Sequence, residues 1–238
     1  MERVRILHAA DIHLGEDLYG NAHGPELPRQ ALRALVDVAR GAGADLVIIA
    51  GDLFDSNRVD SDTVEFAIEQ LLRLPVPAVV LPGNHDCLVA DSVYERPEFT
   101  HMESPIHILR AADGETVDFP GLDTAVWGKP ITSYGGDLRP LAIPPLRVPR
   151  RWRLALGHGY YSGETPDSLY SFQISREEIE NSGMDYVALG HHSEFRCVFD
   201  GAVKACYSGS ASSGSRSVVL VDLVDGSGVF ISPRRLPL

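Results

Sequence analysis

The sequence has few cysteines and a deficit of basic residues. Its 238 residues include 3 cysteines, and 21 lysines and arginines stand against 33 aspartates and glutamates, for a formal net charge of -12. Secreted disulfide scaffolds carry many cysteines in even number, so we expect free thiols here. We assume a two-residue hairpin turn at Asp200-Gly201. That turn would place Cys197 opposite Lys204 rather than Cys206, which argues against a bridge between the two cysteines.

Long apolar runs are also missing. No stretch approaches the 18 or so uncharged apolar residues that a membrane-spanning helix needs, and residues 1–25 lack a basic start followed by an apolar run. We therefore expect a soluble, cytoplasmic protein that does not interact with a membrane. The acidic balance disfavours strong non-specific binding to a polyanion such as DNA.

The first third of the chain has the pattern of a β-α-β-α-β unit. Apolar runs at 4–10, 46–50 and 78–81 predict strands. The segments between them carry apolar residues at helical spacing, which gives each predicted helix one face to pack on a sheet. These residues are Leu32, Leu35, Val36 and Ala39 in the first segment and Val64, Ala67, Ile68, Leu71 and Leu72 in the second.

From residue 106 onward the sequence is mainly short β-rich segments, including 123–127, 153–156, 186–189, 196–199, 203–207 and 218–224. Ser175 and Glu178 form a possible capping box for one further helix. With 44% hydrophobic residues, the chain can bury one sizeable core, so we expect a single domain over residues 1–238. The predicted class is α/β, with two sheets packed face to face and helices outside. A doubly wound open sheet is the alternative.

Polar side chains follow five of the predicted strands directly. Because the carboxyl ends of strands in such sheets meet at one crevice, we expect these side chains to share a site. They occur in Asp11-Ile12-His13, Gly51-Asp52, Gly83-Asn84-His85-Asp86, Gly157-His158 and Gly190-His191.

The residue types in these segments are those of a transition-metal site. Carboxylate oxygen and imidazole nitrogen together suit Mn, Fe or Zn better than Ca or Mg. In an extended Asp-x-His, Asp11 and His13 point the same way, and a carboxylate such as Asp52 can bridge two cations about 3.5 to 4 Å apart. Glycines before the ligands would relieve steric limits where the chain turns beside the ions. His8, within the first strand, is expected to be a core histidine.

In their order and spacing these motifs resemble those of the calcineurin-like metallophosphoesterases: Asp-x-His, Gly-Asp, Gly-Asn-His-Asp/Glu, Gly-His and Gly-His-x-His. The resemblance covers residues 5–210, and segments 6–15, 188–191 and 207–210 are most similar to SbcD-type DNA repair exonucleases. It implies a sandwich of two mixed β-sheets flanked by helices. It also implies a hydrolase that cleaves phosphodiester bonds with metal-activated water, and an ATPase partner.

The resemblance assigns roles residue by residue. Two divalent metal ions, Mn in the first instance and Fe or Zn as alternatives, would occupy the site, with Asp52 bridging them. His85 would contact the scissile phosphate and protonate the leaving oxygen, and Asp86 would orient it. The remaining metal ligands would be Asp11 and His13 at the first metal, and Asn84, His158 and His191 at the second.

One position departs from the family pattern. The last motif normally ends His-x-His, but this chain reads His191-His192-Ser193. The residue that usually completes the first metal site is therefore missing, unless water, Ser193 or a displaced His192 replaces it. We predict weaker binding at the first metal than at the second.

Three functions follow from these motifs. The first is a phosphodiesterase acting on DNA. The second is hydrolysis of a small nucleotide or cyclic nucleotide, which an acidic domain could bind without a long basic track. The third, prompted by the missing histidine, is a non-catalytic binding module. Tyr160, Tyr161 and Tyr170 follow His158 and could line a substrate cleft or simply pack.

Overall fold

The computed structural model describes residues 3–15, 26–101, 105–135, 138–142, 149–165 and 170–238. In chain order its elements are β1 (Arg3–Ala9), α1 (Glu26–Ala42), β2 (Leu46–Ala50), α2 (Ser61–Leu72), β3 (Ala78–Leu81), η1 (Val93–Glu95), α3 (Pro97–Thr100), β4 (Ile106–Ile108), β5 (Glu115–Phe119), η2 (Pro120–Leu122), β6 (Thr124–Gly128), β7 (Trp152–His158), β8 (Tyr160–Gly163), β9 (Gln173–Ser175), α4 (Arg176–Glu180), β10 (Tyr186–Gly190), β11 (Phe195–Asp200), β12 (Lys204–Ser208), β13 (Ser217–Val224) and β14 (Gly228–Arg235).

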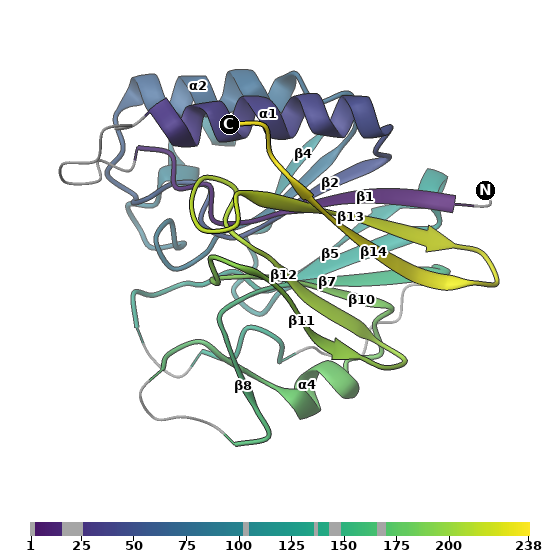
Figure 1. The fold of residues 1–238 in the computed structure, drawn as a ribbon. Coiled ribbons are helices and arrows are strands. Elements are labelled where there is room, and N and C mark those ends of the chain that lie inside the picture. Colours follow the sequence, from purple (N-terminus) through teal and green to yellow (C-terminus); the bar gives the residue numbers. More distant parts are fainter. Residues whose placement is uncertain (1–2, 16–25, 102–104, 136–137, 143–148, 166–169) are drawn as a thin grey trace.

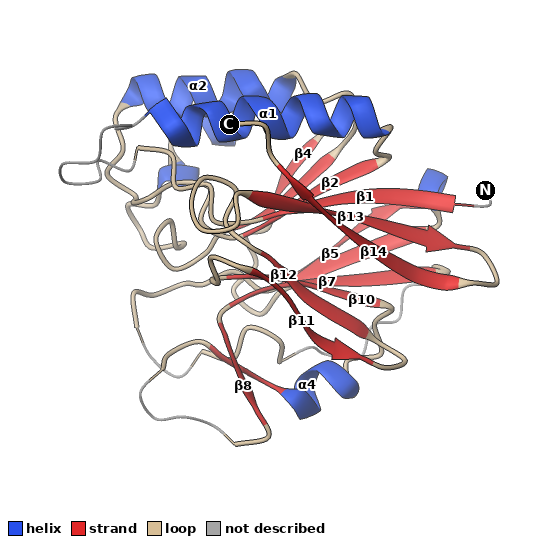
Figure 2. Ribbon diagram, in the orientation of Figure 1, coloured by secondary structure: helices blue, strands red, loops and turns tan. Residues whose placement is uncertain are grey.

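Two mixed six-stranded sheets form the centre of the molecule. The first has the order β14-β13-β1-β2-β3-β4 and the second β11-β12-β10-β7-β6-β5. Each contains a parallel block, with antiparallel strands added at its margins. Figure 1 shows the sheets facing each other, with α1 and α2 over the first and α4 beside the second. The predicted face-to-face arrangement is confirmed, and the alternative of one doubly wound open sheet is wrong (Figure 2).

The central parallel strands of the first sheet are buried on both faces, which explains their continuous apolar sequences. Every residue of β2 and β3 is buried. Side chains such as Ile48 and Leu154 pack between the two sheets, whereas Val47 and Leu35 pack between the first sheet and its helices. His8 lies in the layer between the sheets, where its Nδ1 is 2.9 Å from the hydroxyl of Tyr186. The expectation of a core histidine is confirmed.

The helices begin where the sequence provides caps. Asp60 accepts a hydrogen bond from the amide of Thr63 at 2.7 Å and so caps α2. The predicted capping box of Ser175 and Glu178 opens α4. Within the part of the chain described here, no helix is both long and apolar enough to cross a membrane.

The cysteine prediction is wrong for two of the three thiols. Cys197 and Cys206 form a disulfide between β11 and β12, with their Cα atoms 4.0 Å apart. Asp200 pairs with Lys204, so the hairpin loop is longer than the assumed two-residue turn, and by itself this loop would place Cys197 opposite Tyr207. A bulge between Cys197 and Phe199 then shifts the register back by one residue. Together these changes place the two cysteines opposite each other. Cys87 is free and buried.

Candidate metal centre

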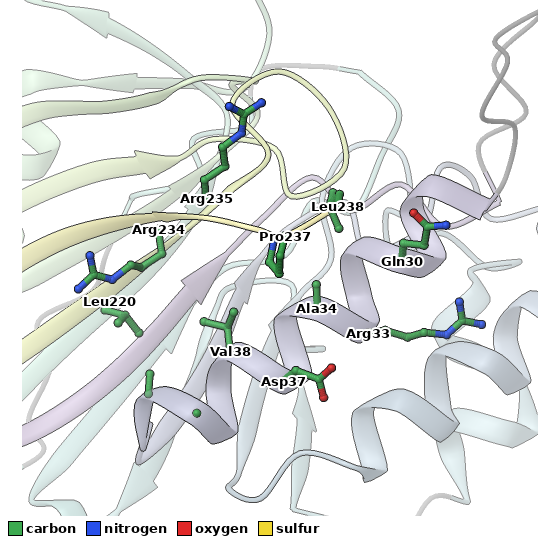
Figure 3. Close-up of a pocket in the computed structure, with 12 residues that line it drawn as sticks. Gln30, Arg33, Ala34, Asp37, Val38, Leu220, Arg234, Arg235, Pro237 and Leu238 are labelled. Carbon is green, nitrogen blue, oxygen red and sulfur yellow. The ribbon is translucent and has the colours of Figure 1, made fainter.

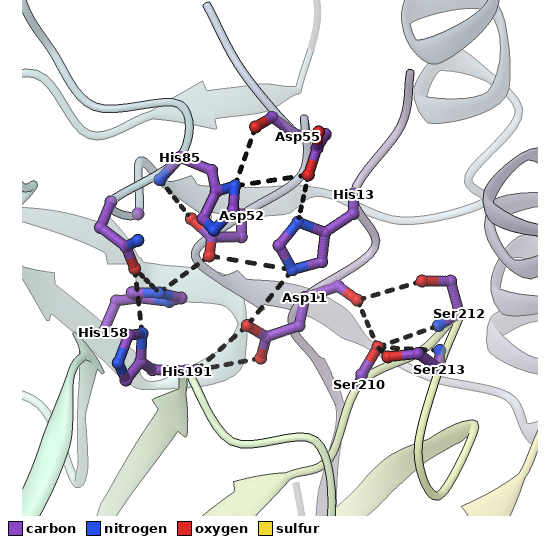
Figure 4. A network of polar contacts seen from close by, with 12 residues as sticks. Asp11, His13, Asp52, Asp55, His85, His158, His191, Ser210, Ser212 and Ser213 are labelled. Carbon is purple, nitrogen blue, oxygen red and sulfur yellow. Dashed lines mark hydrogen bonds and ion pairs between the residues drawn. The ribbon is translucent and has the colours of Figure 1, made fainter. Parts of the chain in front are cut away.

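The predicted ligands lie at the ends of strands, or directly after them, at one end of the sandwich. The segment after β1 runs beside the segment after β2, with the amide of Asp11 donating to the carbonyl of Gly51 at 3.1 Å and that of Ile12 donating to Asp52 at 2.9 Å. Strands β3, β7 and β10 deliver the remaining ligands. Figure 4 shows the side chains from these strand ends pointing at one another.

The backbone at this site is held in an unfavourable conformation. Asp11, His13, Asp52 and His191 have φ values of 53°, 54°, 53° and 98°, a region that side-chain-bearing residues rarely adopt. Such conformations persist where the surrounding structure enforces them, and they occur preferentially at functional sites. Gly51, at φ 94°, is required sterically because a Cβ there would collide with the ring of His158.

Four side chains form what we call the closed half of the site: Asp52, Asn84, His158 and His191. Nε2 of His158 is 3.1 Å from Oδ2 of Asp52 and 2.9 Å from Oδ1 of Asn84, and Nδ1 of His191 is 2.9 Å from the same amide oxygen. Nδ1 of His158 is 2.8 Å from the carbonyl of Ala50. A hydrogen bond there places the proton on Nδ1 and leaves Nε2 as the metal-binding nitrogen.

The open half consists of Asp11, His13 and the shared Asp52. Nε2 of His13 is 3.9 Å from a carboxylate oxygen of Asp11 and from one of Asp52. Asp11 is fixed from behind, because its carboxylate accepts a hydrogen bond from the amide of His191 at 2.9 Å. Its carbonyl accepts one from Ser210 Oγ at 2.7 Å.

His192 does not take the place of the missing histidine. His192 turns toward Tyr207, with ring centroids 5.3 Å apart, and accepts a hydrogen bond on Nδ1 from the amide of Glu194 at 3.1 Å. The carbonyl of Ser193 accepts hydrogen bonds from the amides of Ser210 and Ser215. In the described part of the chain, His192 belongs to none of the groups of potential ligands.

Asp55 is a candidate site residue that the sequence analysis missed. Its carboxylate Oδ1 lies 3.2 Å from Nδ1 of His13 and 3.3 Å from Nδ1 of His85, and its carbonyl lies 2.8 Å from Nδ1 of His85. The hydrogen bond to Asp55 raises the pKa of His85 to about 9, although burial opposes this. The available signal was a second acidic residue only three positions after Asp52, in the loop that follows β2.

The role predicted for Asp86 is wrong in this geometry. Its carboxylate oxygens accept hydrogen bonds from the amide of Gly83 at 2.7 Å, the amide of Phe54 at 3.1 Å and the hydroxyl of Tyr94 at 2.7 Å. Asp86 therefore holds the loop that carries Asn84 and His85, and Asp55 orients the His85 ring.

Electrostatics at the centre fit a cation site. Burial and the charge of Asp52 raise the pKa of Asp11 to about 6, against the opposing effect of His158. Burial would lower the pKa of His158, but Asp52 raises it to about 9. Burial and the charge of His158 lower the pKa of His191 to about 4. Adjacent buried carboxylates are thus balanced by protons, and a divalent cation would replace those protons.

The donor set fits divalent transition metals. In each of the groups Asp52/His158/His191 and Asp11/His13/Asp52, one donor atom per residue lies within 4.8 Å of the others. Carboxylate, imidazole and amide donors suit Mn, Fe or Zn. The structure therefore brings together all six predicted metal ligands and His85, and places Asp86 behind them.

A hollow of about 650 Å³ lies between α1 and the C-terminal segment, away from the metal centre (Figure 3). Its lining includes Arg33, Val38, Arg234 and Leu238. None of the candidate metal ligands contributes to it.

Comparisons with known proteins agree with this geometry. The family model of the calcineurin-like phosphoesterases matches residues 4–194. The uncharacterized metallophosphoesterase YhaO of Bacillus subtilis (strain 168) is 30% identical over 207 residues, covering 78% of this chain and 48% of YhaO. The chain thus spans about half the length of that curated relative.

Solved structures share the fold at low sequence identity. The protein TT1561 of Thermus thermophilus superposes with a TM-score of 0.61 at 14% identity, covering 96% of this chain and 98% of that one. A dimetal phosphatase from Danio rerio gives a TM-score of 0.64 at 12% identity, covering 98% and 96% of the two chains. At these identities the likeness shows the fold alone.

Proposed function

The chain belongs to the calcineurin-like phosphoesterase family, and from that membership we propose that it is a two-metal phosphodiesterase that acts on nucleic acid and prefers DNA. One observation carries the proposal: two groups of metal donors share Asp52, and His85 stands beside them with its own partner, Asp55. This arrangement supports hydrolysis better than a binding module, for which an oriented histidine outside the ligand set has no use.

The ligand side chains divide between the two ions. Asp52, Asn84, His158 and His191 would hold one, and Asp11, His13 and Asp52 the other. When bound, divalent cations neutralise phosphate oxygens and lower the pKa of the attacking water. Asp55 holds the proton of His13 on Nδ1, so Nε2 faces the open half.

His85 is positioned to handle the leaving group. Its backbone amide donates to Asp52 Oδ1 at 3.0 Å, which holds the backbone of His85 next to the carboxylate that the two ions would share. Its Nδ1 is engaged by Asp55, so Nε2 is the nitrogen that can meet a substrate oxygen. The carboxylate of Asp55 stabilises the protonated ring, and a proton on Nε2 can pass to the leaving alkoxide.

A second candidate is hydrolysis of small nucleotides or cyclic nucleotides. The formal charge of -12 favours it, because a long polyanion gains little from an acidic surface. The two candidates use the same ligands and the same His85, so they differ only in what surrounds the phosphate.

The test is hydrolysis of bis(p-nitrophenyl) phosphate by the purified chain with Mn²⁺. We expect activity that falls by about 10²- to 10⁴-fold in His85→Ala, the usual contribution of a general acid. Metal content should stay unchanged, because His85 lies outside both halves. His101→Ala, the same change at an exposed histidine, is the matched control. No hydrolysis by the wild type, or full activity in His85→Ala, contradicts the proposal.

A substrate panel then separates the candidates. Single-stranded DNA, duplex DNA ends and cyclic nucleotides are compared by kcat/KM under the same conditions. The proposal predicts the highest value for a DNA substrate. A higher value for a cyclic nucleotide would establish the second candidate.

A further inference from the structure

Two tyrosines are exposed on segments that adjoin the metal centre. Tyr134 is 64% exposed and Tyr170 is 46% exposed, which is unusual for large side chains in this structure. Tyr170 stacks on Tyr160, with ring centroids 3.9 Å apart and planes 10° apart. Tyr160 is only two residues beyond the ligand His158, so its backbone lies within about 7 Å of that ligand.

The stacked pair is built into a rigid frame. The amide of Tyr160 donates to the carbonyl of Phe172 at 3.1 Å, and Phe172 itself has a φ of 53°. A side chain at Gly159 would collide with the Phe172 carbonyl, so the two segments can approach only because that residue is glycine. The strained turn at Phe172 thus fixes the position of Tyr170.

A small apolar cluster ties both tyrosine-bearing segments to the metal-binding loop after β3. Cys87, Ile131 and Phe172 pack together in it. Cys87 is two residues beyond His85, Ile131 three residues before Tyr134, and Phe172 two residues beyond Tyr170. The amide of Leu88 also donates to the carbonyl of Ile131 at 2.8 Å.

Tyr134 has a second anchor on the side of His85. Asn57 Nδ2 donates to the Tyr134 hydroxyl at 3.0 Å and to the carbonyl of Cys87 at 2.9 Å. Asn57 is buried, and it follows Asp55 by two residues. The hydroxyl is therefore held while the ring remains exposed, so its orientation depends on the same loop that orients His85.

We propose that Tyr134 and the stacked pair Tyr160–Tyr170 form a nucleobase-binding rim around the metal centre. The proposal rests on the phosphodiesterase function proposed above and adds the surface that would hold the bases of its substrate. An exposed aromatic ring binds any base by stacking, without reading its sequence, and stacking makes little demand on net charge. An acidic domain could in this way hold a nucleotide whose backbone it does not attract.

The experiment compares two oligomers that share the same sugar-phosphate backbone, one with bases and one without. Binding of a labelled single-stranded dT oligomer and of its abasic counterpart is measured by fluorescence anisotropy, with Ca²⁺ in place of Mn²⁺. We expect Tyr170→Ala and Tyr134→Ala each to weaken dT binding by about 5- to 100-fold, the range for one lost stack. Binding of the abasic oligomer should change by less than twofold. Tyr170→Phe should bind dT like the wild type, because it keeps the ring.

Phe230→Ala is the matched control, because Phe230 is a similarly exposed aromatic residue, 51% exposed, on β14. Competition between a cyclic nucleotide and the labelled dT oligomer shows whether the rim binds the base of a single nucleotide or only the bases of a strand. Either result supports the rim. Equal losses for dT and abasic oligomers, or no loss in either tyrosine variant, overturn the proposal. The bis(p-nitrophenyl) phosphate assay reports separately on the phosphodiesterase function.

Discussion

The two halves of the metal centre differ in how many ligands the chain supplies to each. The closed half combines one carboxylate, one amide and two imidazoles, and its His158 is fully buried with Nδ1 held by a backbone carbonyl. The open half has only Asp11 and His13 beside the shared Asp52, with longer separations of 3.9 Å. Membership of Asp52 in both donor groups therefore does not make the two halves equal.

The difference arises at one position of one loop. After His191 the chain turns His192 onto Tyr207, and Ser193 uses its carbonyl to hold the serine-rich segment. That segment in turn supports Asp11 through Ser210. The loop thus positions the open half without adding a ligand to it, and we expect one tight and one weak metal.

Removal of the Asp52 carboxylate, which belongs to both halves, should prevent metal binding at both and so abolish the difference in affinity between them. We expect Asp52→Asn to lose both metals and to lower kcat/KM by about 10³-fold or more, since each ion contributes several kcal/mol to catalysis. Elemental analysis and kinetics measure the two effects. Asp91→Asn, at an exposed aspartate, is the control. Retention of one equivalent of metal would show that Asp52 is not shared.

Removal of one imidazole from each half should separate them. His191→Ala should weaken the tighter metal by more than about 100-fold, beyond the 10- to 100-fold typical of changes behind the ligands. His13→Ala should leave that metal in place and affect only the weaker one. Both are read by calorimetric titration with Mn²⁺. If His13→Ala instead removes the tighter metal, the assignment of the halves is reversed.

Separate substitutions of Asp55 and Asp86 test which of the two carboxylates orients His85. Asp55→Asn should weaken the metal of the open half by about 10- to 100-fold and lower kcat, because it loosens His13 and His85 together. Asp86→Asn should instead reduce the free energy of unfolding by about 1 to 3 kcal/mol, because its buried hydrogen bonds weaken. Titration and denaturant unfolding of both variants distinguish the two roles. If Asp86→Asn instead weakened metal binding and lowered kcat, and Asp55→Asn only reduced stability, Asp86 would be the partner of His85.

Restoring the family residue should make the halves more alike. Ser193 is exposed, so Ser193→His has space for a ring, and we expect the weaker metal to bind about tenfold more tightly. Affinity at the closed half should not change. Ser227→His, at an exposed serine in the turn between β13 and β14, is the control. An unchanged weak site would mean that position 193 is not what limits it.

The smallest predicted effect concerns His8, a buried histidine outside the metal centre. Burial lowers the pKa of His8 to about 3, whereas an unfolded histidine titrates near 6.5. Between these pH values the unfolded chain binds more protons, so the free energy of unfolding falls as pH falls, by up to about 1.4 kcal/mol per pH unit. Urea unfolding of wild type and His8→Gln from pH 7 to 4 should show a flatter decline in the variant. Parallel declines would assign the acid sensitivity to other groups.

The sequence predicted the strands that carry the ligands because they are buried on both faces and end at polar residues. Segments with weaker patterns were missed, among them β14, which is an edge strand containing Pro233, and the short pair β8 and β9. The Cys197–Cys206 disulfide was also missed, because its register depends on a bulge that leaves no periodic signal.

At the site, the ligands were predictable and their supports were not. Asp11, Asp52 and His158 could be found because each follows an apolar strand. Asp55 and the Tyr134 anchor depend on how a loop folds back over its neighbours, which follows from tertiary contacts rather than from spacing.

The most direct test of the unequal centre is a calorimetric titration of the metal-free wild-type chain with Mn²⁺, with bound metal counted by elemental analysis. Two steps of different affinity are predicted, and the tighter one should disappear in His191→Ala. Two equivalents that bind together with one affinity would contradict the account.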